Sequence, residues 1–389
     1  MTFRHRHGSI AEDAEGQRLT SKAHHGGWLP LALALAVLAG CGTPPAVLES
    51  EPELDTFAQQ RHRNSLHLHA QLLCGGVFIS GRPASVVIDQ DLRWEGYTFH
   101  DWEKTSWDID TGIRRVTLRS SEYGELVEAS AVHNPGHGCS LLPDGVKEVS
   151  FTPLPPVSPP GAVDTESADI PPPSDDQMNT WLERVFQADE TALSDNGDQQ
   201  TRAIVVLHRG RIVAERYAPA FGPAMPLLGW SMGKSVAAAL LGVYAAESNT
   251  FDIDKPGLIS EWSASNDPRA AITPRHLLNM AAGLEFANPG MDDPTYYTDT
   301  HDHESVYFRA QDTRSQILSA HHANTPGKQF AYRNTYTLGL MALLRQKLEE
   351  RGESYQRWPY EALFAPLGTR SFVLEPDFMG NFVISGFVY

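Results

Sequence analysis

The sequence predicts an α/β protein built from several parts, and three observations lead to this fold class. Short apolar or alternating runs, broken by Gly, Pro and Asp, fill residues 66–149 and are typical of strands. A second pair of β-rich runs, "AIVVLHRGRIVAERYA", has the pattern of a hairpin. Helix-forming runs follow it, so strands and helices share the second half of the 389-residue chain.

The first part of the chain has the pattern of a leader. The apolar run "WLPLALALAVLAGC" is too short to span a bilayer. It ends in small residues at a cysteine, which is typical of a signal peptide. "LAGC" resembles the lipobox of bacterial lipoproteins, which implies cleavage after residue 40 and a diacylglyceryl group on Cys41. We therefore expect residues 1–40 to be a signal peptide, residues 41–60 a tether, and the protein to be lipid-anchored in a bacterial envelope, on the outer membrane facing the periplasm. A buried N-terminal helix is the alternative.

Residues 61–150 predict a small β-rich domain, with runs such as "GGVFISG", "GIRRVTLRS" and "ELVEASAVH" as its strands. If Cys41 carries lipid, Cys74 and Cys139 remain as an even pair in an oxidising compartment, so we expect a disulfide between them. Two separate buried thiols are the alternative.

Residues 151–178 are dense in proline and poor in large apolar residues, which predicts an extended connector and a domain boundary. A proline-rich ligand for another protein is the less favoured interpretation. The net charge of −17 argues against a nucleic-acid partner, because such binders set lysine and arginine against phosphates.

Residues 179–389 carry the chemistry. After the hairpin, Ser231 opens a helix-forming run and Lys234 lies one helical turn further, on the same face. A serine hydroxyl becomes a nucleophile only beside a base, and a partly buried lysine can serve. Alone, the pair is weak evidence, since an N-cap serine and a lysine reaching to solvent give the same pattern.

A second motif strengthens the first. "PGKQFAYRNTYTLGL" holds Tyr332 and Asn334, the only Tyr-x-Asn of the chain, in a turn just before an amphipathic helix. A tyrosine beside a lysine can return a proton to a leaving group, and an asparagine amide can hold the lysine and a substrate carbonyl.

These motifs, in this order, resemble the serine β-lactamase and penicillin-binding-protein superfamily in its class C-like branch. "HRGRIVAERYAPAFGPAMPLLGWSMGKSV" and "ITPRHLLNMAAGLEF" are similar to the 6-aminohexanoate-dimer (nylon-oligomer) hydrolases and related esterases. The resemblance implies an antiparallel sheet made from the hairpin and C-terminal strands, flanked by helices, with a helical insertion. It also implies a nucleophile at Ser231, a base at Lys234, an acid/base at Tyr332 with Asn334 in support, and neither cofactor nor metal.

The third element of such enzymes, Lys-Thr-Gly or His-x-Gly, has no match after Asn334, and the last residues, "GNFVISGFVY", stop within the family pattern. We therefore expect a C-terminally truncated domain with little or no turnover. Three functions compete: hydrolysis of a small amide or ester, a β-lactamase or peptidoglycan peptidase, and a non-catalytic envelope lipoprotein.

Three further features of the sequence have less specific patterns. Tyr296 and Tyr297 lie in a polar loop that we expect either to cover the substrate or simply to face solvent. The "THDHE" run in that loop favours a solvated surface over a metal site. Trp230 is expected to pack in the core beneath the nucleophile.

Overall fold

The structure is a computed structural model that describes residues 52–93, 100–153, 176–191, 201–248, 250–285, 306–308, 311–369 and 371–389. Ser50–Tyr389 forms one compact unit. Both sheets are antiparallel and helices pack against them, so the predicted α/β class is confirmed. No helix in these ranges is both long and apolar enough to cross a membrane.

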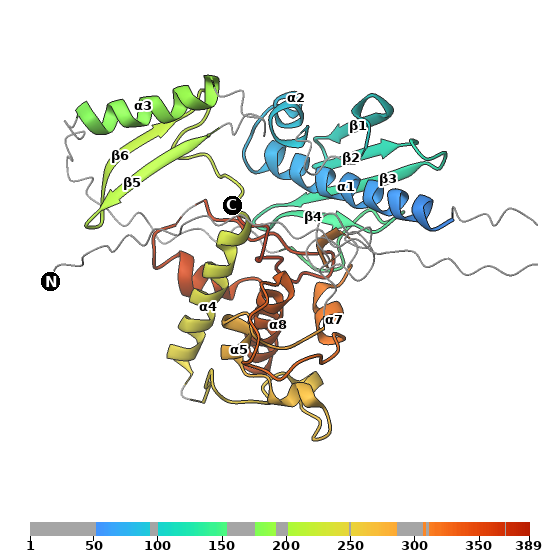
Figure 1. Cartoon of the computed structure of the whole chain (residues 1–389), viewed down its shortest axis with the longest axis vertical. Helices are drawn as coiled ribbons and strands as arrows, with labels where there is room; N and C mark the ends of the chain where they lie inside the picture. Colours follow the sequence, from blue (N-terminus) through green and yellow to red (C-terminus); the bar gives the residue numbers. More distant parts are fainter. Residues whose placement is uncertain are drawn as a thin grey trace, which may run out of the picture. The chain divides into compact units, whose positions relative to one another are not determined.

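The first part of this unit, which we call the N-terminal module (residues 52–142), is a long helix laid across a four-stranded sheet (Figure 1). The strands pair in chain order. The elements are α1 (Pro52–Phe78), α2 (Ala84–Val87), β1 (Thr105–Asp110), β2 (Arg115–Ser120), β3 (Val127–Asn134) and β4 (Gly138–Leu142). Alternate residues of β3 face the helix: Val127, Ala129 and Ala131 are buried in the module's core with the disulfide cysteines.

Cys74 of α1 and Cys139 of β4 are joined by a disulfide, which is the predicted pairing. The predicted strand at "GGVFISG" and the last residues of the predicted tether were wrong, because α1 runs from Pro52 through Phe78. The glycines there do not break the helix; they permit close contact. A Cβ on Gly76 would lie 2.7 Å from Val87, and one on Gly75 would lie 2.0 Å from the Tyr389 hydroxyl.

The hairpin forms as predicted, from β5 (Ala203–His208) and β6 (Arg211–Tyr217). Its turn places Arg209 and Gly210 at φ of 50° and 77°, which suits a two-residue turn that needs positive φ. Helix α3 (Asp176–Thr191), which begins inside the predicted linker, packs against β6. Within the described ranges β5 and β6 pair only with each other, so the C-terminal strands that the resemblance implies beside the hairpin are not found there.

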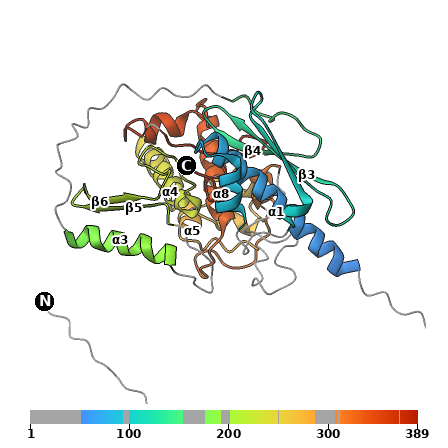
Figure 2. The same cartoon turned by 90° about the horizontal axis from the view of Figure 1, so that it is seen from above.

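The remaining helices build two cores around α8. They are α4 (Gly233–Glu247), α5 (Pro274–Leu278), α7 (Thr313–Leu318) and α8 (Asn334–Glu350). Figure 2 shows α8 beside α4, and the two helices are in contact. Leu240 of α4 and Leu344 of α8 are buried in one core, while Trp262 and Tyr336 are buried in the other. Burial of α8 on most of its faces fixes the place of Asn334 at its first turn.

Residues 371–389, which we call the C-terminal segment, fold back on themselves in an irregular antiparallel ladder. Isolated bridges join Leu374 to Val388 and Pro376 to Phe382. Asp377 ties the segment to the start of α7 by accepting hydrogen bonds from the Thr313 backbone N–H and hydroxyl at 2.8 and 2.9 Å. The segment therefore lies inside the protein rather than at its edge, and Tyr389 is buried.

Candidate functional site

Ser231 lies in a tight turn at the start of α4. A 3₁₀ turn, Trp230–Met232, precedes the helix, and the Met232 N–H donates to the Gly229 carbonyl at 3.1 Å. Trp230 has φ of 44°, a left-handed conformation that is uncommon for a bulky residue and that clusters at functional sites. The turn leaves Ser231 exposed to solvent, where a substrate can reach it.

Lys234 is held from three sides. Its Nζ lies 3.0 Å from Ser231 Oγ, 2.7 Å from Asn334 Oδ1 and 2.7 Å from the Ser385 carbonyl oxygen. The spacing in the sequence explains the first contact, because residues three apart share a helix face. Asn334 reaches the same point because it opens α8. The structure therefore brings together Ser231, Lys234 and Asn334.

Tyr332 completes the group. The Lys234 Nζ lies 4.9 Å from the centre of its ring. Partial burial raises the pKa of the phenol, but hydrogen bonds with Ser231 and Lys234 and the lysine charge lower it, and the net pKa lies below the usual value. Ser231 and Lys234 therefore stabilise the tyrosinate form of Tyr332 relative to that of a free phenol.

Several polar partners lie within hydrogen-bond distance of Nζ. Asn334 Oδ1 and the Ser385 carbonyl each accept an N–H of Lys234 at 2.7 Å, and Tyr332 also forms a hydrogen bond with Lys234. Ser231 Oγ lies 3.0 Å from the same nitrogen. An ammonium presents an N–H in that direction, whereas a neutral amine presents its lone pair, which can accept the hydroxyl proton. This arrangement suits activation of a serine nucleophile.

Exposed apolar side chains lie close in sequence to Ser231 and Tyr332. Trp230 is 46% exposed, and Met232 and Phe330 are each 70% exposed. The expectation that Trp230 is a core residue was therefore wrong, although its ring contacts that of Phe387, with the centroids 5.6 Å apart. The positive φ turns the tryptophan outward, and a sequence pattern does not reveal that conformation.

Ser385 is a site residue that the sequence reasoning missed. It contributes a backbone carbonyl to Lys234, and its hydroxyl lies 2.5 Å from the hydroxyl of Tyr307. A backbone contact of this kind leaves no residue-type signal, so no motif could have identified it. It does show that the C-terminal segment reaches the site.

Other predicted residues lie outside the described ranges: Cys41, Tyr296, Tyr297 and the "THDHE" run. Among the residues that the structure describes, no three His, Cys, Asp or Glu side chains gather as metal ligands would. A buried histidine group, with His69 Nδ1 2.7 Å from His100 Nε2, lies in the N-terminal module. Burial lowers the pKa of His69 to about 3 and that of His100 to about 4, so both rings are neutral.

Comparison with known proteins shows what the sequence and the fold are similar to. Residues 186–378 match the Beta-lactamase family model. A solved structure named for a 6-aminohexanoate-dimer hydrolase, from Bacillus anthracis, is 22% identical over 53% of this chain and 52% of its own, with a TM-score of 0.41. Another, named for a β-lactamase from Bacteroides dorei, is 21% identical over 55% of this chain and 57% of its own, with a TM-score of 0.37. The chain thus spans about half the length of these solved relatives. No curated protein matches it.

Proposed function

We propose that this chain, whose residues 186–378 belong to the serine β-lactamase-like superfamily, is a serine hydrolase that cleaves amide or ester bonds through an acyl-enzyme on Ser231. The observation that carries the proposal is the placing of Lys234 Nζ. Asn334 Oδ1 and the Ser385 carbonyl each lie 2.7 Å from this nitrogen, and Ser231 Oγ lies 3.0 Å from it.

In this proposal the Ser231 proton passes to neutral Lys234 as Oγ bonds to the substrate carbonyl carbon. Lys234 and Tyr332 then return a proton to the leaving amine or alcohol as its bond to that carbon breaks. Water adds to the acyl-enzyme, gives its proton to the same pair, and displaces Ser231, which regains its hydrogen. The Ser231 backbone N–H, at the start of a helix, donates to the developing oxyanion.

The surroundings favour a substrate with an apolar part. Met232 lies in the turn that carries Ser231, which we call the nucleophile turn (residues 229–232), and Phe330 lies two residues before Tyr332. Both side chains are largely exposed, and an acyl chain could cover them. A small neutral ester or linear amide fits this setting better than a strongly charged substrate. Tyr296 and Tyr297 remain predicted contacts for the same substrate.

The test is reaction with a serine-directed fluorophosphonate, followed by intact mass and peptide mapping. We expect one adduct, on Ser231, and its loss in Ser231→Ala. A burst of p-nitrophenol from p-nitrophenyl butyrate, followed by a measured steady rate, then separates acylation from turnover. The steady rate after the burst tests the expectation of slow turnover, which rests on the missing third motif. Covalent trapping by penicillin instead of the ester would assign the site to β-lactams or peptidoglycan peptides.

We also propose that the protein is held at the envelope membrane by lipid on Cys41. The support is the "LAGC" pattern and the apolar run before it. Metabolic labelling with a fatty acid, with Cys41→Ser as the control, tests this independently of catalysis.

A further inference from the structure

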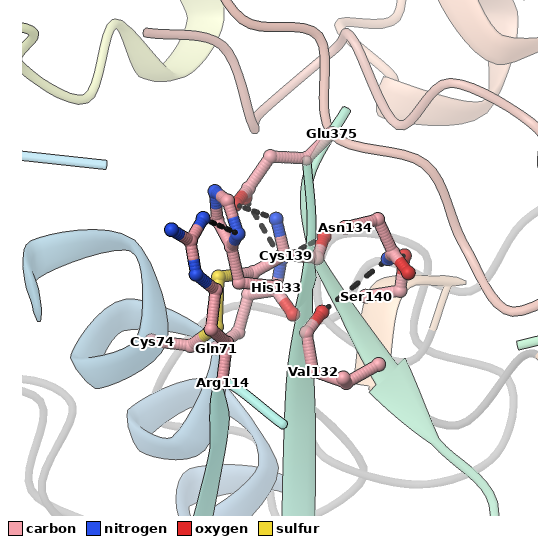
Figure 3. The surroundings of a disulfide bond; sticks show 9 residues. All are labelled: Gln71, Cys74, Arg114, Val132, His133, Asn134, Cys139, Ser140 and Glu375. Carbon is pink, nitrogen blue, oxygen red and sulfur yellow. Dashed lines mark hydrogen bonds between the residues drawn. A yellow bond between two sulfur atoms is a disulfide. The ribbon is translucent and has the colours of Figure 1, made fainter. Parts of the chain in front are cut away.

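The N-terminal module contacts the C-terminal segment through a buried carboxyl group. Glu375 is fully buried, and its Oε1 accepts a hydrogen bond from the Cys139 backbone N–H at 2.8 Å. Its Oε2 accepts one from Gln71 Nε2 at 2.8 Å, and the same nitrogen donates to the Cys139 carbonyl at 2.9 Å. Figure 3 shows Glu375 above the Cys74–Cys139 disulfide, which joins the helix bearing Gln71 to the strand bearing Cys139.

Glycines on the module let the segment approach closely. A Cβ on Gly138 would lie 2.7 Å from Val373 and 2.9 Å from the Glu375 side chain. Gly75 stands against the Tyr389 hydroxyl in the same way. Apolar contacts continue this surface, because Leu68 of α1 is buried in one cluster with Phe387. The contact between module and segment is thus packed as a core is packed.

Inside the segment, the backbone at Glu375 sets the position of the last residues. The Val383 N–H donates to the Glu375 carbonyl at 2.9 Å, and the Glu375 N–H donates to the Phe387 carbonyl at 3.3 Å. Val373 and Tyr389 exchange two backbone hydrogen bonds of 2.8 and 2.9 Å. A shift of Glu375 therefore moves residues 383–389.

Those residues hold the nucleophile turn. The Gly229 N–H donates to the Val388 carbonyl at 2.7 Å, and Lys234 Nζ donates to the Ser385 carbonyl at 2.7 Å. Ser385, whose carbonyl holds Lys234, thus lies two residues along the chain from each backbone partner of Glu375, Val383 and Phe387.

We propose that Glu375 is a positioning residue for the Ser231–Lys234 pair, and that the N-terminal module, through Gln71 and Cys139, forms a working part of the active site. We call the effect of Glu375 on the reaction rate of Ser231 the catalytic half of this inference, and its effect on the position of residues 229–235 the mechanical half. The catalytic half rests on the proposed function; the mechanical half does not. Burial of an acidic group at this contact, where an apolar residue would cost less, is consistent with a role in fixing geometry. Burial also raises the pKa of Glu375 to about 8.

Two variants break the anchor in different ways. Glu375→Ala removes the carboxyl group, and Gln71→Met keeps the volume but removes the donor. Glu375→Gln is the conservative variant, since its carbonyl can still accept the Cys139 N–H. Thr117→Val is the matched control: Thr117 is also buried in the module, but its hydroxyl pairs with Ser130, away from the segment.

Two measurements read the result in full-length protein. Hydrogen exchange of peptides covering 229–235 and 383–389 should quicken about tenfold in Glu375→Ala and Gln71→Met, because a buried partner is lost, and stay unchanged in Thr117→Val. The maximal rate of fluorophosphonate reaction should fall about a hundredfold in Glu375→Ala, because a displacement of Lys234 from Ser231 by about 1 Å is enough to cause such a loss. The half-saturating concentration of the reagent should change little. Glu375→Gln should restore most of that rate.

Unchanged exchange at 229–235 in Gln71→Met would overturn the proposal, even if Glu375→Ala fails to fold. Quickened exchange with an unchanged maximal rate in the anchor variants would overturn the catalytic half. If the native protein does not react with the reagent at all, the proposed function fails, and the exchange data alone decide whether the module holds the turn.

Discussion

Gly233→Ala tests the contact between the nucleophile turn and the C-terminal segment most sharply. Gly233 has φ of −57° and ψ of −23°, an ordinary helical conformation, so alanine introduces no backbone strain. Its Cβ, however, would lie 1.9 Å from the Ile384 carbonyl oxygen and 3.0 Å from Val388 Cγ1. The carbonyl must therefore move by about 1.5 Å to reach an ordinary contact distance.

Ile384 directly precedes Ser385, so the movement is passed to the carbonyl that holds Lys234 at 2.7 Å. A hydrogen bond lengthened by about 1 Å is lost. We expect the free energy of unfolding to fall by about 1–3 kcal/mol, the usual range for overpacking. The rate of Ser231 phosphonylation should fall about a hundredfold as the lysine loses its position.

The same helix supplies the control. Gly242 also lies in α4, and nothing stands within 4 Å of a Cβ added there. Gly242→Ala should stabilise the protein by about 0.5–1 kcal/mol, because alanine has the higher helix propensity. Urea denaturation and the phosphonylation rate are compared for both variants. Equal stability and equal rates would refute the close approach of Ile384 to the nucleophile turn.

Three further predictions follow from the structure. Burial raises the pKa of Glu375 from 4.5 to about 8, so between these values the folded state retains a proton that the unfolded chain releases. The free energy of unfolding, measured relative to Glu375→Gln by urea denaturation, should therefore fall as the pH rises from 4.5 to about 8. A difference between the two proteins that does not change with pH would contradict this. Removing the disulfide with Cys74→Ala and Cys139→Ala, which span 65 residues, should cost about 4 kcal/mol, and a loss near zero in calorimetry would argue against it. Phe330→Ser should slow the reaction with a long-chain alkyl fluorophosphonate about tenfold relative to the reaction with a short-chain one. Leu367→Ser is the control, because Leu367 is similarly exposed and should not affect this ratio. Equal changes of the ratio in both variants would contradict an apolar acyl site at Phe330.

The contact between Ser231 and Lys234 was predicted from their spacing, because residues three apart share a helix face. Tyr332 and Asn334 were expected beside them from the family resemblance, and the structure places Asn334 Oδ1 2.7 Å from Lys234 Nζ. The catalytic roles of these residues stay a prediction. The hairpin was equally readable, since Arg209 and Gly210 mark its turn. The cysteine pair was predicted from parity and compartment, and the structure has that bond.

Long-range packing was not readable in the same way. The run "GGVFISG" was predicted as a strand, yet Gly75 and Gly76 lie in α1, where the lack of a side chain admits Tyr389 and Val87. Ser385 acts through a carbonyl that every residue type carries. Trp230 has the composition of a core residue but a backbone conformation that turns it outward. Each of these depends on contacts between distant segments, which residue spacing does not encode.

The most direct test of Ser231 as the nucleophile is the mass of the folded protein after reaction with the fluorophosphonate. We expect a single covalent adduct that maps to Ser231, disappears in Ser231→Ala and forms much more slowly in Lys234→Ala. A folded native protein that gains no mass, or an adduct that persists in Ser231→Ala, would contradict the assignment of Ser231 as the nucleophile.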